Sequence, residues 1–155
     1  MRRADKKIND KNVIEAILQE SDHCVIGISH NNSPYTVPMN FGYKNNNLYL
    51  HSSSEGRKIE ILKVNNKVSF SVEIKTELVK SVEACNWGMK YMSVIGFGFA
   101  HFIEDVNKKI DALDIIMNKY SNKDLEAFQY SETAINGIVM IKVEVVELTG
   151  KISGY

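Results

Sequence analysis

The chain has 155 residues, 44% of them hydrophobic and 25% charged, which is typical of one ordinary globular domain with a substantial core. Lysine plus arginine and aspartate plus glutamate each number 19, so bulk charge indicates neither nucleic acid nor an anionic membrane as a partner. No apolar run approaches the ~20 residues of a membrane span, and the charged N-terminus lacks the apolar segment of a secretory signal. Cys24 and Cys85 form no Cys-x-x-Cys pair, so we expect reduced thiols in a cytoplasmic protein.

The first third of the sequence predicts one helix followed by three strands. Asp10 is placed to cap a helix that ends before Ser21. The expected apolar face of this helix consists of Val13, Ile14, Ile17 and Leu18, with Ile8 ahead of it as a staple. Strands are expected at 23–29, 35–44 and 48–52. The run Asn45–Asn47 tolerates positive φ and predicts a hairpin between the last two strands.

The rest of the chain predicts two more helices and three more strands. We expect helices at 54–64 and 105–120 and strands at 68–75, 91–104 and 137–150, whereas residues 76–89 have no clear assignment. Six strands, mostly joined by short turns, predict a six-stranded antiparallel barrel with flanking helices. A parallel α/β sheet would need a regular strand–helix alternation that this sequence lacks. We expect a single domain over residues 1–155.

The segment from His51 to Lys58 indicates a phosphate site. Ser52 and Glu55 have the spacing of a capping box at a helix N-terminus. Arg57 and Lys58 follow in the first turn, where the helix already carries about +0.5 charge. A bound anion would remove this conflict, and hydroxyls, free N–H groups, a glycine, an Arg and a Lys suit a phosphate monoester. The alternative is that both cations are solvated residues of an ordinary surface helix.

The order of strand, His-Ser-x-x-x-Gly-Arg-Lys, helix and strand resembles the flavin-binding split barrels related to pyridoxamine phosphate oxidase. The segments VPMNFGY, LYLHSSSEGRK and ACNWGMKYMSVIGFGFAHFIED, with the opening MRRADKKI, more narrowly resemble the nitroimidazole resistance subfamily. The resemblance covers nearly the whole chain. It implies an FMN-binding split barrel, a small-molecule substrate and a homodimer with two flavin sites at the subunit interface. The balanced charge and the lack of a long apolar run indicate no nucleic-acid or membrane partner.

The same resemblance implies a role for seven residues. It places Ser52, Arg57 and Lys58 at the flavin phosphate, and Val37, Met39 and Asn40 along the isoalloxazine ring. His51 would lie near the edge of the ring. The oxidase itself has an additional C-terminal Trp and Arg that grip pyridoxamine phosphate and flavin, whereas this chain ends KISGY, which argues against vitamin oxidase activity.

Several other residues leave alternatives open. Gly96 and Gly98 share one face of a strand and indicate either a barrel bend or the close approach of a flat ring. Trp87 suits a ligand-pocket wall, an apolar core or a dimer interface. His51 is the candidate catalytic residue, as a proton donor, although an imidazole that merely packs against the cofactor is the competing interpretation.

Three functions are compatible with this sequence. The first is an FMN-dependent oxidoreductase, similar to a nitroreductase, that reduces nitroimidazoles or other small nitroaromatic compounds. The second is a flavin- or haem-binding protein without turnover, in which His51 or His101 ligates iron. The third is a barrel with an empty site, which the intact Gly56-Arg57-Lys58 argues against. No nucleophilic triad, paired acid/base carboxylates or metal-ligand spacing stands out, so no metal is expected.

Overall fold

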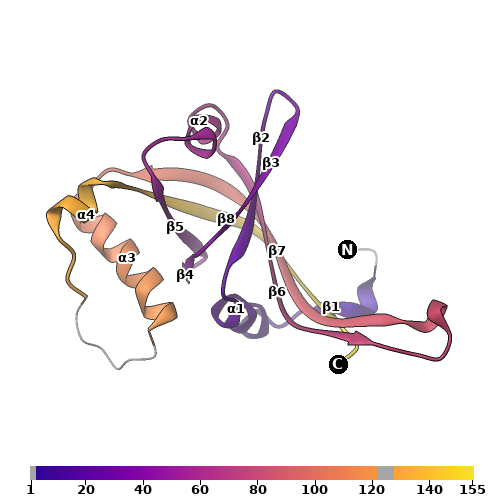
Figure 1. The fold of residues 1–155 in the computed structure, drawn as a ribbon. Helices are drawn as coiled ribbons and strands as arrows, with labels where there is room; N and C mark the ends of the chain where they lie inside the picture. Colours follow the sequence, from indigo (N-terminus) through magenta and orange to yellow (C-terminus); the bar gives the residue numbers. More distant parts are fainter. Residues whose placement is uncertain (1–2, 122–127) are drawn as a thin grey trace.

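The computed structural model describes residues 3–121 and 128–155, and all of its described strands belong to one antiparallel sheet (Figure 1). The strands are β1 (Lys7–Ile8), β2 (Cys24–His30), β3 (Ser33–Met39), β4 (Gly42–Lys44), β5 (Asn47–Ser53), β6 (Lys67–Val79), β7 (Gly88–Ile103) and β8 (Ile138–Ser153). The helices are α1 (Lys11–Glu20), α2 (Arg57–Val64), α3 (Val106–Tyr120) and α4 (Glu132–Asn136), with 3₁₀ turns at Ala4–Lys6 and Ala84–Asn86. Met1 and Arg2 of the MRRADKKI segment lie outside the described residues.

The prediction of an antiparallel split barrel with flanking helices is confirmed, but the predicted number of six strands is wrong, since there are eight among the described residues. The order is β3-β2-β6-β7-β8-β5-β4, and the short β1 pairs with β8. The predicted strand 35–44 is divided, because β3 pairs with β2 and β4 pairs with β5. Phe41, between them, is buried and donates its backbone N–H to Tyr120 Oη at 3.0 Å. The chain therefore crosses here from one edge of the sheet to the other.

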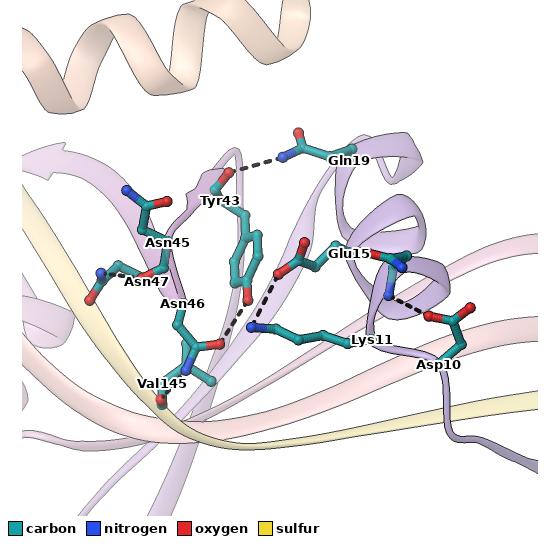
Figure 2. Close-up of polar contacts among 10 residues, drawn as sticks. Asp10, Lys11, Glu15, Gln19, Tyr43, Asn45, Asn46, Asn47 and Val145 are labelled. Carbon is teal, nitrogen blue, oxygen red and sulfur yellow. Dashed lines mark hydrogen bonds and ion pairs between the residues drawn. The ribbon is translucent and has the colours of Figure 1, made fainter.

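Paired asparagines form the tight turns, as predicted for residues 45–47. Asn45 and Asn46 have φ of 52° and 63°, which suits the two-residue turn that matches the twist of a hairpin. Figure 2 shows that Tyr43 Oη donates to Asn46 Oδ1 at 3.2 Å, while Asn46 Nδ2 donates to the carbonyl of Val145 at 3.1 Å. Gln19 Nε2 of α1 donates to the carbonyl of Tyr43 at 2.9 Å. These bonds attach the β4–β5 hairpin to β8 and to α1.

The helices cover the two faces of the sheet differently. Asp10 caps α1 as predicted, accepting from the N–H of Asn12 at 2.8 Å, and Ile14, Ile17 and Leu18 are buried against the barrel interior. The predicted inclusion of Val13 in this face is wrong, because its side chain is exposed. On the outer face, α3 packs on β4 and β5, and its Ala112 and Ile116 form a buried cluster with Met140 of β8. No helix in the described part of the chain is long and apolar enough to cross a bilayer.

Two long strands extend past the rest of the sheet. The last pair between β7 and β8 is Tyr91 with Ser153, yet β6 and β7 remain paired as far as Val79 and Gly88. We call residues 76–90 the ribbon; it forms the arm that projects at the lower right of Figure 1. Most of the stretch 76–89, which the sequence left unassigned, lies in these strand ends and in the 3₁₀ turn between them.

Gly96 and Gly98 face the barrel interior at a bend. A Cβ at Gly98 would overlap the carbonyl oxygen of Glu144, and one at Gly96 would overlap the ring of Phe70. The register between β7 and β8 shifts between Phe97 and Gly98, which brings the backbone of β8 inward. The space beside both glycines is thus filled by the chain itself, which favours the barrel-bend interpretation over the approach of a ring.

We expect Gly98→Ala to lower the free energy of unfolding by about 3 kcal/mol, because the new methyl group must displace the backbone of β8. Gly88→Ala is the matched control, since a Cβ there meets nothing within 4 Å. Urea denaturation followed by circular dichroism measures both variants. Equal midpoints for the two would contradict this account of the bend.

Candidate functional site

The connection between β5 and α2 forms a cavity of about 400 Å³ at the surface of the barrel. It is lined by Tyr35, His51, Ser52, Ser53, Glu55, Gly56, Arg57 and Lys58. The structure therefore brings together four residues that the sequence singled out for a phosphate and its surroundings, namely His51, Ser52, Arg57 and Lys58. They are close because they lie within one short segment that turns from a strand into a helix.

The predicted capping box at Ser52 and Glu55 is wrong. Ser52 belongs to β5, where it is paired with Val139 of β8, and its side chain is buried. This pairing continues through Ser53, and the helix begins only at Arg57, with Gly56 as its N-cap. Long-range pairing with β8 thus keeps Ser52 and Ser53 in the strand, and the spacing of Ser52 and Glu55 does not reveal this pairing.

The N-terminus of α2 is built around Gly56. This residue has φ of 110° and ψ of 166°, a conformation that favours glycine, and no side chain caps the helix. Its carbonyl accepts from the N–H groups of Ile59 at 2.9 Å and Glu60 at 3.1 Å. Among the described residues, no hydrogen-bond partner is found for the N–H groups of Arg57 and Lys58. Two donors at the positive end of the helix are therefore free to bind an anion.

The two cations of this turn have no carboxylate partner within 4 Å in the described parts of the chain. The Arg57 guanidinium lies over the ring of Tyr35, 4.9 Å from its centroid. Lys58 Nζ lies 3.5 Å from Met39 Sδ, and burial lowers the pKa of Lys58. A partly desolvated ammonium without a counter-ion is costly, and an anion in the cavity would reduce that cost. The exposed Glu55 opposes an anion, but two cations outnumber it.

His51 and Ser52 project to opposite faces of β5, as the alternation of a strand requires. Ser52 is buried on the barrel side, whereas His51 is exposed. Both nevertheless line the cavity. His51 is therefore directed away from the barrel interior and is accessible to a small molecule.

The predicted ring contacts lie on or next to β3, the strand at one edge of the sheet. Val37 and Met39 share the inward face of this strand with Tyr35. Of the predicted residues in this region, Met39 approaches the cavity most clearly, through Lys58, whereas Val37 does not line it. Asn40 also lies outside the lining, since its side-chain Nδ2 donates to the carbonyl of Asp22 at 3.5 Å.

Sequence reasoning missed Tyr35 as part of the site. Its contact with Arg57 joins β3, the strand at one edge of the sheet, to helix α2. The alternation of Tyr35, Val37 and Met39 with exposed residues was a signal that these three side chains point the same way. Nothing in the local pattern indicated that Tyr35 would lie beside Arg57, because that contact depends on the arrangement of the strands in the whole sheet.

A wider cleft of about 560 Å³ lies between α3 and the ends of β7 and β8. Its lining includes Tyr49, His101, Ile103, Glu104, Asp105, Lys108 and Lys142. Tyr49 and His51 are two residues apart on β5, so this cleft and the cavity at residues 51–58 lie next to each other on one strand. We refer to it below as the α3 cleft. Its charges are mixed, with no concentration of cations comparable to that at Arg57 and Lys58.

Comparison with known proteins gives one family and several similar structures. The family model described as pyridoxamine 5′-phosphate oxidase matches residues 10–152. A crystal structure of a candidate 5-nitroimidazole antibiotic resistance protein from Bacteroides thetaiotaomicron is 42% identical, with a TM-score of 0.83, over 94% of this chain and 86% of that one. No curated protein matches the sequence.

Two more distant structures share the fold. The flavocytochrome Anf3 from Azotobacter vinelandii is 22% identical with a TM-score of 0.86, over 100% of this chain and 72% of that one. A FAD and haem binding protein from Mycobacterium smegmatis is 16% identical with a TM-score of 0.85, over 97% and 74% of the two chains. At these identities the similarity concerns the arrangement of the strands and helices.

Proposed function

Because this chain belongs to the pyridoxamine 5′-phosphate oxidase family, we propose that it binds FMN at residues 51–58 and is an oxidoreductase acting on nitroimidazoles or other small nitroaromatic compounds. One observation carries the proposal: Arg57 and Lys58 lie without carboxylate partners among the described residues, at an open helix N-terminus beside a cavity. The name of the 42%-identical protein supports the class of substrate.

The residues of the cavity fit a terminal phosphate. Gly56 has no side chain to obstruct the approach of an oxygen to the free N–H groups of Arg57 and Lys58. Arg57 supplies a planar fork of donors that stacks on the ring of Tyr35, and Lys58 supplies a point charge. Met39, which contacts Lys58, is the β3 residue proposed nearest to this turn, and the ring contacts proposed for Val37 and Asn40 lie beyond the cavity lining. When bound, the flavin supplies the redox chemistry, while this chain binds and orients it.

His51 is the residue we propose for proton transfer. Its imidazole is exposed beside the phosphate turn, on the face of β5 that does not enter the barrel. A nitro group that gains electrons also takes up protons, and imidazole is the side chain that exchanges protons near neutral pH. His51 would hold that proton on a ring nitrogen.

We further propose a homodimer of cytoplasmic protein. Ile95, Phe97 and Phe99 are exposed at alternate positions of β7, and an apolar stripe of this kind is typical of an interface. Reduced thiols, expected in the cytoplasm, agree with the free Cys24 and Cys85.

A non-catalytic flavin- or haem-binding protein is the second candidate function. The observation that favours haem is the position of His101 in the α3 cleft, whose volume of about 560 Å³ suits a large ligand. Lys108 and Lys142 in the same lining would suit the carboxylates of such a ligand. The absorption spectrum of the purified protein separates the two candidates, since haem gives a Soret band and flavin gives bands in the blue.

We expect the protein to bind FMN at least 100-fold more tightly than riboflavin, because two charge-assisted contacts to phosphate are worth about 3 kcal/mol or more. Titration calorimetry with both ligands measures this ratio. Reduction of the bound flavin by nicotinamide cofactors, with and without a nitroimidazole, then tests turnover. Equal affinities for the two ligands would remove the basis of the phosphate site.

A further inference from the structure

A further cavity, of about 300 Å³, lies between α1, β4 and α3 and shares no residue with the cavity at residues 51–58. α3 packs directly on β4 here, since a Cβ at Gly42 would come within 2.8 Å of the Ile115 side chain. The residues of α3 that line the cavity share one face of the helix, because they are three and four positions apart. The lining consists of Gln19 from α1, Tyr43 and Lys44 from β4, and Ile115, Asn118 and Lys119 from α3.

Both charged side chains of this lining are cations. Lys44 is exposed at the end of β4, and Lys119 is half-buried near the end of α3. Among the described residues, no carboxylate lies within 4 Å of either ammonium. Asp22 acts on Lys119 only from a greater distance, and the Cys24 thiol near it stays neutral because burial raises its pKa to about 12. The cavity therefore has an excess of positive charge.

Lys119 is held by two contacts that leave part of its ammonium group available. Its Nζ donates to the carbonyl of Leu18 at 2.9 Å and lies 3.1 Å from the centroid of the buried Phe41 ring. An ammonium has three N–H donors, so one remains for a ligand in the cavity that Lys119 lines. Burial lowers the pKa of Lys119 to about 8, so the group is still charged at neutral pH although it is partly desolvated. An anion in the cavity would stabilise this charge.

Uncharged groups of the lining add further donors and an apolar wall. Gln19 Nε2 donates to the carbonyl of Tyr43 at 2.9 Å, which fixes this carboxamide and leaves its second N–H for another acceptor (Figure 2). Asn118 adds a second carboxamide, and Ile115 adds an apolar surface. This combination suits a carboxylate on a small apolar body better than a bare inorganic ion.

Negative groups of α1 and α3 oppose an anion here, but too weakly to reverse the sign. The C-terminus of each helix carries about −0.5 charge, so together the two termini offset about half of the charge of the two ammoniums. On α1, the Glu15 carboxylate pairs with Lys11 at 3.6 Å and the Glu20 carboxylate pairs with Lys75 at 3.4 Å. These two carboxylates are therefore matched by other lysines, and the cavity keeps its positive excess.

We propose that this cavity binds a small organic carboxylate, whose oxygens accept from Lys119, Lys44 and the carboxamides while its apolar body lies against Ile115. The cavity is built from α1, β4 and α3, whereas the proposed flavin site is built from β5 and α2. The chain thus has a second ligand site, which requires neither the flavin nor His51.

NMR titration of the protein, as purified and again with FMN added, tests this site with benzoate as the probe and benzamide as its uncharged counterpart. Benzoate should bind about tenfold or more tightly than benzamide and should shift the side-chain amide signals of Gln19 and Asn118, because its contacts are charge-assisted. Lys119→Gln should weaken benzoate binding by about tenfold or more. Lys63→Gln is the matched control, an exposed lysine on α2, and should leave the affinity unchanged.

Lys44→Gln is a second test, because Lys119 also holds the end of α1 whereas the Lys44 side chain is exposed. It should weaken benzoate binding about two- to fivefold, as expected for an exposed ion pair. Equal affinities for benzoate and benzamide, or an unchanged benzoate affinity in both lysine variants, would overturn the proposal. Tighter binding of inorganic phosphate than of benzoate would overturn it too. Signals that shift only at residues 51–58 and no longer shift once FMN is added would place the anion at the flavin site and likewise refute the second site.

Discussion

Replacing Arg57 and Lys58 together by alanine is expected to weaken FMN binding by roughly 3–6 kcal/mol, or about 10²- to 10⁴-fold. Each side chain is placed to make a charge-assisted contact to phosphate beside the free N–H groups of α2. The effect should be much smaller with riboflavin, because the lost contacts concern the phosphate. Titration of both variants and both ligands by calorimetry measures this difference.

Lys63→Ala is the matched control, because Lys63 is an exposed cation in the last turn of the same helix. It should leave FMN affinity within about twofold of the original, since surface charges at this distance are screened by salt. Without FMN, the double variant should resist urea at least as well as the unchanged chain, because burial disfavours the charge of Lys58. A double variant that unfolds more easily and still binds FMN would assign these residues a structural role.

Local sequence signals predicted the local features of this fold. The Asp10 cap, the Asn45–Asn46 turn and helix α3 depend on neighbouring residues, and each agrees with the structure. The division of 35–44 into β3 and β4 depends instead on Tyr120, far along the chain, which receives the N–H of Phe41. The short β1 exists because β8 lies beside it. Such pairings are invisible in a local pattern of apolar residues.

The candidate site likewise combines features that a local pattern predicts with features that depend on distant parts of the chain. His51, Ser52, Arg57 and Lys58 were predicted together because eight consecutive residues contain them, and they line one cavity. The capping role of Ser52 was wrong, since pairing with Val139 holds that residue in β5.

The contributions of β3 were harder to predict. Tyr35 was missed, and Asn40 contacts the carbonyl of Asp22 outside the cavity lining. The position of β3 relative to α2 follows from the order of the strands in the whole sheet, so no short motif contains it.

His51→Ala is expected to slow reoxidation of the reduced holoprotein by a nitroaromatic compound by about 10²- to 10⁴-fold, the usual worth of a general acid. FMN affinity should change little, because His51 lies on the face of β5 opposite Ser52 and the phosphate turn supplies the charged contacts. Stopped-flow absorbance measures reoxidation across a range of pH, and calorimetry measures affinity. His30→Ala is the control, an exposed histidine at the end of β2.

The pH profile decides between a chemical role and a packing role for His51. If the imidazole supplies the proton, the reoxidation rate of the unchanged chain depends on pH, whereas the alanine variant has lost that dependence. His51→Gln keeps a polar side chain of similar size but cannot exchange the proton, so it should be as slow as His51→Ala. Weakened FMN binding with normal reoxidation per bound flavin would show instead that His51 holds the cofactor. Full activity in His51→Gln would point the same way, because a side chain that only packs can be replaced by one of similar shape.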